Sequence, residues 1–177
     1  YINNLRRTND NFYVLKCDIK KYFYNIDHEI LLNMLRKFIP DETILDILRD
    51  ILETTNSESM NMEINRVIDA EKKRLVDTHN PYIADKFIEL DSIPHYHLHK
   101  GLPIGNMTSQ ILAIFYLNDL DHYIKEQLHI KYYIRYMDDL VLLHEDKEYL
   151  KECLEKITIF LKEKCALNLH PKKTRIY

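Results

Sequence analysis

The chain has 177 residues, of which 46% are hydrophobic and 30% charged, enough for one good core but short for two domains. No apolar run approaches the roughly 20 residues of a membrane span, and no signal-peptide pattern is present, so we expect no membrane association. The net charge of −3 weakly disfavours nucleic-acid binding. The basic residues nevertheless cluster near the two ends, at Arg6, Arg7, Lys16, Lys20 and Lys21 and at Lys162, Lys164, Lys172, Lys173 and Arg175.

The first half of the chain predicts one strand followed by helices. Residues 12–19 (FYVLKCDI) are rich in β-branched and aromatic residues and predict a strand that ends near Asp18. Asp27 is a candidate N-cap for a helix over 28–38, stopped by Pro40, and Asp41 for the next helix. Residues 60–76 predict a surface helix with one apolar side. Residues 77–95 fit a loop with a short helix.

The second half begins with a turn that contains both glycines of the chain, Gly101 and Gly105. Glycine permits close backbone approach and positive φ, so this turn is a candidate ligand site. Thr108 or Ser109 could cap an apolar helix over 110–128, predicted to be buried all round. A hairpin follows, with strands at 131–137 and 140–144, then a helix over 146–165 and short strand-like segments around 167–169 and 173–177.

Without the helices between residues 28 and 95, the order is strand, helix, strand, strand, helix, strand. This order predicts an α+β fold, a ferredoxin-like antiparallel sheet with helices on one face. The remaining helices form an insertion. Because the chain opens with Tyr1 and closes on a strand-like run, we expect a piece of a longer protein. Its three cysteines lack metal-binding spacing and fit buried positions in a reducing compartment.

Asp138 and Asp139 stand between two apolar strands, YYIRYM and LVLL. They could form a solvent-facing turn, but tight hairpins favour Asn-Gly or Asp-Gly, and adjacent carboxylates repel each other unless a cation joins them. Asp18 could simply cap a strand end. In the ferredoxin-like order, however, its strand neighbours the hairpin, so three carboxylates would converge. Such oxygen-rich sites suit Mg²⁺.

Four motifs give the chain a family resemblance. Tyr136–Asp139 (YMDD) resembles the YxDD signature of reverse transcriptases, and Asp18–Phe23 (DIKKYF) with Asn25–His28 (NIDH) resembles their first catalytic motif. Gly101–Gln110 (GLPIGNMTSQ) resembles the motif that carries the incoming nucleotide and template. Leu167–Thr174 (LNLHPKKT) resembles the later motif with a proton-transfer lysine. The ordered set covers most of residues 11–177 and is far more specific than YMDD alone.

The resemblance implies roles for matching residues. Asp18, Asp138 and Asp139, with the Ile19 carbonyl, would hold two Mg²⁺ ions, for which Mn²⁺ could substitute, and Lys173 would be a general acid. Lys173 could equally be a solvated lysine. Phe23 would be the steric gate that excludes a 2′-hydroxyl, or else a core aromatic. The implied nucleotide-binding positions are Lys21, Tyr22, Phe23, Ile104, Gly105 and Gln110.

The resemblance also implies an organisation and partners. Residues 1–10 would be the edge of the fingers, 11–29 and 105–177 the palm, and 30–104 a helical insertion, with the thumb absent. RNA template, a DNA or RNA primer, deoxynucleoside triphosphates and an accessory protein would be the partners of a cytoplasmic protein of bacterial, phage or mobile-element origin. Such a fragment would extend a primer poorly.

One departure is informative. Many reverse transcriptases have Gln before the second glycine and Ser-Pro at the helix start, whereas this chain has Ile104 and Ser109-Gln110. That form resembles the enzymes of diversity-generating retroelements and related bacterial lineages. Loss of a polar contact weakens discrimination, so we expect low copying fidelity.

Other functions remain open. A polymerase fold could serve as an RNA-binding maturase or as a template-independent or abortive-infection polymerase, and a ferredoxin-like module could bind RNA through its tyrosines. His95, His97 and His99 alternate as on one strand face, where a metal site is less expected than an exposed face. The helix over 60–76 could contact a partner, although a solvated helix is the simpler interpretation.

Overall fold

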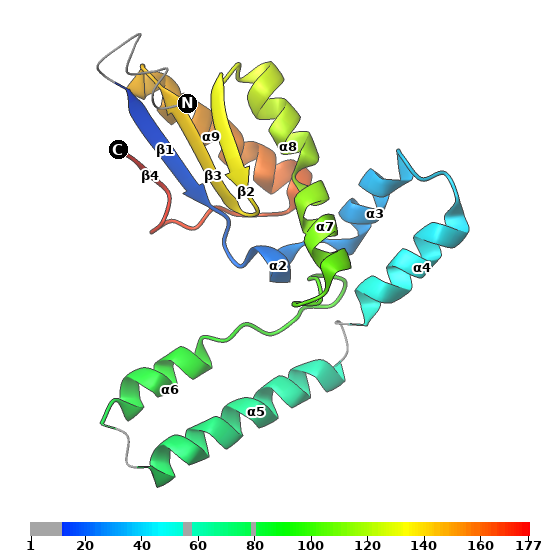
Figure 1. Cartoon of the computed structure of the whole chain (residues 1–177), viewed down its shortest axis with the longest axis vertical. Coiled ribbons are helices and arrows are strands. Elements are labelled where there is room, and N and C mark those ends of the chain that lie inside the picture. The colour runs from blue at the N-terminus through cyan, green and yellow to red at the C-terminus, as the bar shows by residue number, and fades with distance from the viewer. Residues whose placement is uncertain (1–11, 55–57, 79–80) are drawn as a thin grey trace.

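The computed structural model describes residues 12–54, 58–78 and 81–177. The predicted fingers edge at 1–10, with Arg6 and Arg7, lies outside these residues. The described elements are, in chain order, β1 (Tyr13–Asp18), α2 (Tyr22–Asn25), α3 (His28–Arg36), α4 (Glu42–Glu53), α5 (Glu58–Asp77), α6 (Ile83–Asp91), α7 (Met107–Tyr116), α8 (Asn118–His122), the π-helix η1 (Tyr123–Gln127), β2 (Tyr132–Tyr136), β3 (Asp139–His144), α9 (Lys147–Cys165) and β4 (Arg175–Ile176) (Figure 1).

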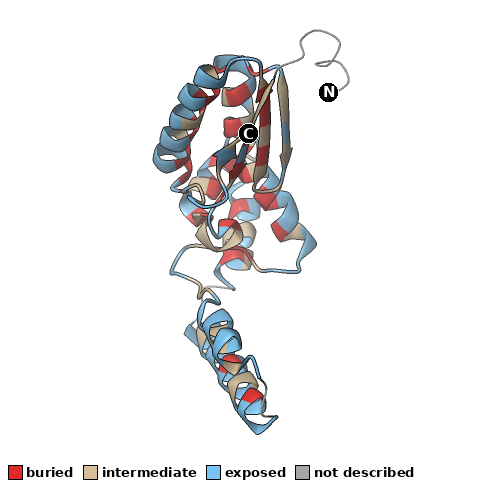
Figure 2. Cartoon of the chain, turned by 90° about the vertical axis from the view of Figure 1, so that its left-hand side faces the viewer, coloured by how far each residue is buried: buried red, intermediate tan, exposed pale blue. Residues whose placement is uncertain are grey.

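The strands form one sheet in the order β2-β3-β1-β4, with antiparallel pairing throughout. This is the strand order of a ferredoxin-like fold, so the α+β prediction is confirmed. Helix α9 lies behind the sheet in Figure 1, with α8 beside β2, and the view turned by 90° in Figure 2 shows α9 along one face of the sheet. The predicted layer of helices on one face is present.

The core lies between this sheet and its helices. Alternate residues of β1, Leu15 and Cys17, are fully buried, whereas Lys16 between them is exposed. Leu150 and Ile157 of α9 are also fully buried. Strands bury every second residue and helices every third or fourth, and both elements follow these periods.

Three aspartates cap helices, and two of these caps, Asp27 and Asp41, were predicted. The carboxylate of Asp27 accepts hydrogen bonds from the backbone amides of Glu29 (3.1 Å) and Ile30 (3.2 Å). The Asp41 carboxylate accepts one from Thr43 at 2.9 Å, and Asp146 caps α9 in the same way. These bonds satisfy amides that the first turn of a helix leaves without partners.

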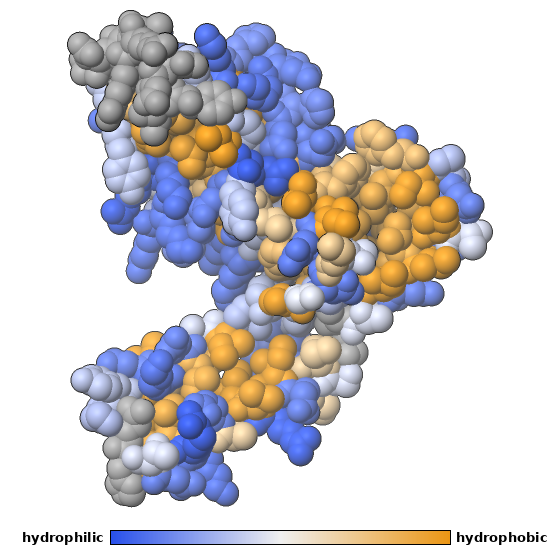
Figure 3. All heavy atoms as spheres, viewed as in Figure 1, coloured by the Kyte–Doolittle hydropathy of each residue, from blue (hydrophilic) through white to orange (hydrophobic). Residues whose placement is uncertain are grey.

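Helices α5 and α6 form a helical arm that extends away from the sheet (Figure 1). The surface helix predicted over 60–76 is confirmed, with Ile68 and Leu75 buried and Val67 exposed. Helix α6 lies within residues 77–95, for which a loop with a short helix was predicted. Figure 3 shows apolar side chains gathered along this arm. Within the described part of the chain, every helix is too short or too polar to cross a bilayer.

The helix predicted over 110–128 differs from the observed one. Its N-cap is Asn106, whose side chain accepts from the Thr108 amide at 3.0 Å, not Thr108 or Ser109. The helix also breaks at Leu117 and ends in a π-helical turn. Burial all round is wrong as well, because one face is left open by Met107, Ile111 and Ile114, which are 76%, 60% and 49% exposed. An apolar composition did not imply that every face had a neighbour.

Candidate functional site

The three predicted carboxylates lie at one end of the sheet. Asp18 is the last residue of β1 and pairs directly with Asp139, the first residue of β3. Asp138 immediately precedes Asp139 in the hairpin. The backbone register therefore brings together residues about 120 positions apart, as the sequence predicted. Their role as metal ligands stays a prediction.

Two lysines neutralise part of this acidic cluster. The Lys173 ammonium lies 3.0 Å from an Asp18 carboxylate oxygen, and Lys16 lies 3.5 Å from an oxygen of Asp139. Burial raises the pKa of Asp138, and repulsion from Asp18 and Asp139 raises it further, while Lys173 opposes the shift. A carboxylate whose charge is disfavoured by its neighbours gains from a nearby cation.

The predicted donor set, the three carboxylates with the backbone carbonyl of Ile19, would suit Mg²⁺ by its chemistry, because all of its ligand atoms are oxygens. Among residues 12–54, 58–78 and 81–177, no three His, Cys, Asp or Glu side chains are gathered closely enough to hold an ion. In this arrangement Asp18 pairs with Lys173 and Asp139 with Lys16. Both pairs would have to open.

The hairpin turn differs from the predicted Asp-Asp turn. Tyr136 pairs with Asp139, so the two loop residues are Met137 and Asp138, and Asp139 belongs to β3. Met137 has a φ of 54°. A side chain at positive φ is strained, and such strain gathers at functional sites.

A cavity of about 280 Å³ lies beside the hairpin and is the candidate nucleotide-binding site. All six positions implied for nucleotide binding line it, together with Asp138 and with Tyr24, which the sequence reasoning missed. The lining residues are Lys21, Tyr22, Phe23, Tyr24, Ile104, Gly105, Gln110 and Asp138. The cavity and the acidic cluster therefore share Asp138.

One wall of this cavity is a loop between β1 and α2. Lys21 adopts a left-handed conformation (φ 49°, ψ 49°), and the Asn25 amide holds the loop by donating to the carbonyls of Lys20 (2.9 Å) and Lys21 (3.1 Å). The buried Tyr22 hydroxyl donates to the Ala113 carbonyl of α7 at 2.5 Å. These bonds fix the loop against the helix that follows the glycine turn.

The glycine turn contributes Ile104 and Gly105 to the lining, and hydrogen bonds tie its first residues to the preceding motif. Gly101 donates from its amide to the Ile26 carbonyl at 2.8 Å, and Leu102 donates to the Phe23 carbonyl at 2.8 Å. The buried ring of His28 bonds the Gly101 carbonyl through Nε2 at 2.7 Å. Burial lowers the pKa of His28, so we assign the neutral tautomer that donates from Nε2. His28 is a second contributor that sequence reasoning missed.

The chain matches the family model described as reverse transcriptase (RNA-dependent DNA polymerase) over residues 2–177. The chain belongs to the reverse transcriptase family. It is 25% identical over 191 aligned residues to the COX1/OXI3 intron 2 protein of Saccharomyces cerevisiae, an alignment that covers 92% of this chain and 22% of that protein.

Two telomerase structures share the fold of this reverse transcriptase chain. Apo telomerase from Candida tropicalis, truncated from the C-terminal domain, superposes with a TM-score of 0.61 at 15% identity, covering 99% of this chain and 33% of that one. Telomerase from Candida albicans in complex with a TWJ fragment of telomeric RNA gives 0.54 at 14%, covering 99% and 28%. The chain thus spans about a third or less of these relatives, and the retroelement subtype stays a prediction.

One motif residue of the reverse transcriptase chain, Lys173, does not line the cavity. Lys173 is largely exposed and faces Asp18 rather than the cavity. The hydrogen bond to Asp18 raises its pKa, so this amine keeps its proton at neutral pH. The role of Lys173 as a general acid stays a prediction.

The histidine alternation does not form a strand face. Residues 93–97 have no regular secondary structure, and His99 has a φ of 57°. The His95 ring bonds the Asn65 side chain of the helical arm at 2.7 Å. The expectation of an exposed strand face was therefore wrong.

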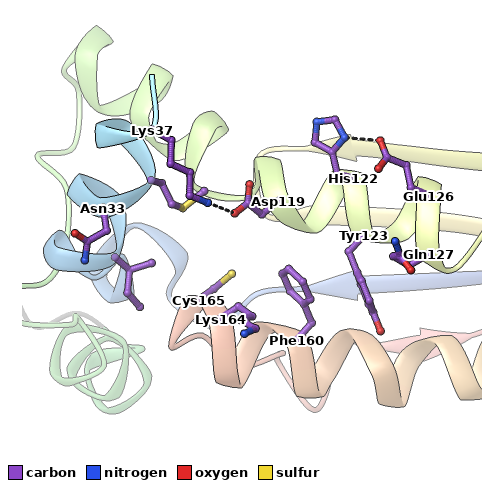
Figure 4. Close-up of a pocket in the computed structure, with 12 residues that line it drawn as sticks. Asn33, Lys37, Asp119, His122, Tyr123, Glu126, Gln127, Phe160, Lys164 and Cys165 are labelled. Atoms are coloured by element: carbon purple, nitrogen blue, oxygen red, sulfur yellow. Dashed lines mark hydrogen bonds and ion pairs between the residues drawn. The ribbon is translucent and has the colours of Figure 1, made fainter. Parts of the chain in front are cut away.

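A larger cavity of about 570 Å³ lies elsewhere in the reverse transcriptase fold, between α3, the α8–η1 segment and α9 (Figure 4). Tyr123 and Phe160 stack in it with ring centroids 4.6 Å apart, and the Lys37–Asp119 ion pair lies at its edge. None of the motif residues lines it, so its size alone does not make it the active site.

Proposed function

We propose that this chain is the catalytic palm, with part of the fingers, of an RNA-directed DNA polymerase. The observation that carries the proposal is the pairing of Asp18 with Asp139 next to a cavity that Asp138 shares with the six motif positions. The proposed palm comprises 11–29 and 105–177, and 30–104 forms the helical insertion. The ferredoxin-like sheet supports this division.

The proposed reaction is attack of a primer 3′-hydroxyl on the α-phosphate of a deoxynucleoside triphosphate, with release of pyrophosphate. Asp18, Asp138 and Asp139, with the Ile19 carbonyl, would hold two Mg²⁺ ions, or Mn²⁺ in their place. When bound, such ions activate an attacking hydroxyl and neutralise charge on the leaving group. The protein mainly positions the reactants.

Individual residues of the cavity take separate tasks in this proposal. Phe23 packs beneath the sugar and excludes a 2′-hydroxyl, and Ile104 presents an aliphatic wall that loosens selection by polar contact. Backbone amides near Lys21 and Tyr22 face the triphosphate. Lys173, which is protonated at neutral pH, donates its proton to the departing pyrophosphate.

The proposed partners are RNA template, primer and deoxynucleoside triphosphates, with an accessory protein as a further candidate. RNA binding is supported by family membership and by the telomerase relative whose structure contains telomeric RNA. A low-fidelity, retroelement-like subtype is proposed from Ile104 and Ser109-Gln110.

Primer extension on an RNA template tests the proposal. The longer natural protein should extend a DNA primer with Mg²⁺, residues 1–177 alone should do so weakly, and Asp138→Asn should abolish synthesis. Asp85→Asn on α6 makes the same chemical change at an exposed site and should leave synthesis intact. Full synthesis by Asp138→Asn would refute the assignment.

A second candidate function is RNA binding without synthesis, as in a maturase. The similarity to an intron protein favours it. If RNA binding persists in Asp138→Asn while the wild-type protein extends no primer under any metal condition, the maturase assignment replaces the polymerase.

A further inference from the structure

The turn that carries Asp138 depends on support from outside the hairpin. It has two loop residues, and the first, Met137, has positive φ although its side chain carries a Cβ atom. Turns of this kind favour glycine at such positions. A strained conformation persists where the surrounding structure over-determines it, and side chains outside the turn bond it.

The side chain of Arg135 in β2 supplies that support. It is only 9% exposed. Its Nη1 donates to the Met137 carbonyl at 3.2 Å, and its Nη2 donates to the Ile114 carbonyl of α7 at 3.0 Å. One guanidinium therefore joins the hairpin turn to the helix that follows the glycine motif.

Asp121 of α8 orients this guanidinium. Its carboxylate accepts from Arg135 Nε at 2.8 Å and from Nη2 at 2.5 Å, a bidentate pair. The Tyr133 hydroxyl donates to the same carboxylate at 2.7 Å. Burial disfavours the Arg135 charge, but Asp121 outweighs that effect, and the pKa of Arg135 is raised. The planar fork of arginine suits these acceptors in a way that the point charge of lysine does not.

We propose that Arg135, oriented by Asp121, is a positioning residue that holds the Met137–Asp138 turn against α7. The Met137 carbonyl and the Asp138 amide belong to one peptide plane. Holding the carbonyl in place therefore also holds the Asp138 backbone, from which the carboxylate side chain extends. Helix α7 also carries Gln110 of the nucleotide cavity. Arg135 thereby sets the position of the carboxylate relative to that wall. This inference rests on the proposed polymerase function.

Steady-state kinetics of the full-length protein test the proposal. Because misplacement of a catalytic group by about 1 Å can cost about 10²-fold in rate, Arg135→Gln should lower kcat by at least about tenfold. The KM for deoxynucleotide should change by less than about threefold, since the cavity walls remain. Tyr133→Phe is the matched control, because it removes a bond to Asp121 and leaves the Met137 carbonyl bonded. It should leave kcat within about twofold.

A charge swap separates positioning from a merely structural ion pair. Asp121→Arg combined with Arg135→Asp restores opposite charges but places no donor at residue 135 for the Met137 carbonyl. It should stay as slow as Arg135→Gln. Recovery of kcat by the swap, or wild-type kcat in Arg135→Gln, would overturn the proposal. If Arg135→Gln does not fold, Arg135→Lys gives the same comparison, with one ammonium in place of the fork.

Hydrogen exchange supplies a readout that does not depend on activity. Amides of residues 132–144 should exchange faster in Arg135→Gln and Arg135→Lys than in Tyr133→Phe, without metal or nucleotide. Equal protection of these amides in all variants would refute the positioning role of Arg135. If the exchange difference is present but the wild-type protein synthesises no DNA, only the polymerase function is refuted.

Discussion

The Gly101→Ala substitution should destabilise the fold through two separable effects. Gly101 has a φ of +93°, where residues with a Cβ atom are strained, and an added Cβ would lie 2.7 Å from Cδ1 of Tyr96. The backbone strain costs on the order of 1–3 kcal/mol. Overpacking against the aromatic ring adds about 1–3 kcal/mol. The expected loss in the free energy of unfolding is therefore about 2–6 kcal/mol.

Gly105→Ala is the matched control. Gly105 has a nearly identical φ of +94°, but nothing lies within 4 Å of an added Cβ. It should lose only the strain contribution, about 1–3 kcal/mol. The difference between the two variants isolates the clash with Tyr96.

Urea unfolding followed by circular dichroism measures both variants and a double-mutant cycle. Tyr96→Ala removes the ring, so the overpacking disappears in the Gly101→Ala/Tyr96→Ala protein. That double variant should be more stable than additivity predicts by about 1–3 kcal/mol. Equal losses for the two glycine variants, or additivity in the cycle, would refute the claim that Gly101 makes room for the ring.

Four further predictions concern single side chains, three of them in the site. The pKa of Asp138 is raised in the folded protein, so its ionised carboxylate destabilises the fold as the pH rises through that pKa. Asp138→Asn should therefore raise the Tm of the metal-free protein at pH 7, and the difference should disappear below about pH 4. An unchanged Tm at pH 7 would contradict this. Asp27→Ala should cost about 1 kcal/mol in urea unfolding, because it removes the N-cap of α3, whereas Asp27→Asn should be nearly neutral. Phe23→Val should admit ribonucleotides at least about tenfold better in primer extension, and unchanged sugar selection would rule out the steric-gate role. Ile104→Gln should alter the error spectrum of the product, and an unchanged spectrum would rule out its role in fidelity.

The sequence predicted what local chemistry determines. Asp27 and Asp41 cap helices as expected, and the β-branched and aromatic residues around Leu15 identified β1. The strand order then followed from topology, and it placed Asp18 beside the hairpin.

Features that depend on tertiary neighbours were missed. Asn106, Thr108 and Ser109 are all good caps, and only the observed backbone selects the first. Ile111 is exposed. Whether another element covers a given face of an apolar helix depends on the tertiary arrangement, which the local sequence does not show. Arg135 and Asp121 lie on different elements, so no local sequence pattern predicted their ion pair.

The proposed metal site can be tested directly by counting bound Mn²⁺ by electron paramagnetic resonance, with the full-length protein, a chain-terminated primer on RNA template and the matching nucleotide. We expect two tightly bound ions per protein and the loss of at least one in Asp18→Asn, with both retained in Asp85→Asn. Two ions retained in Asp18→Asn, or none bound by the wild-type complex, would contradict the shared role of the carboxylates on β1 and the hairpin.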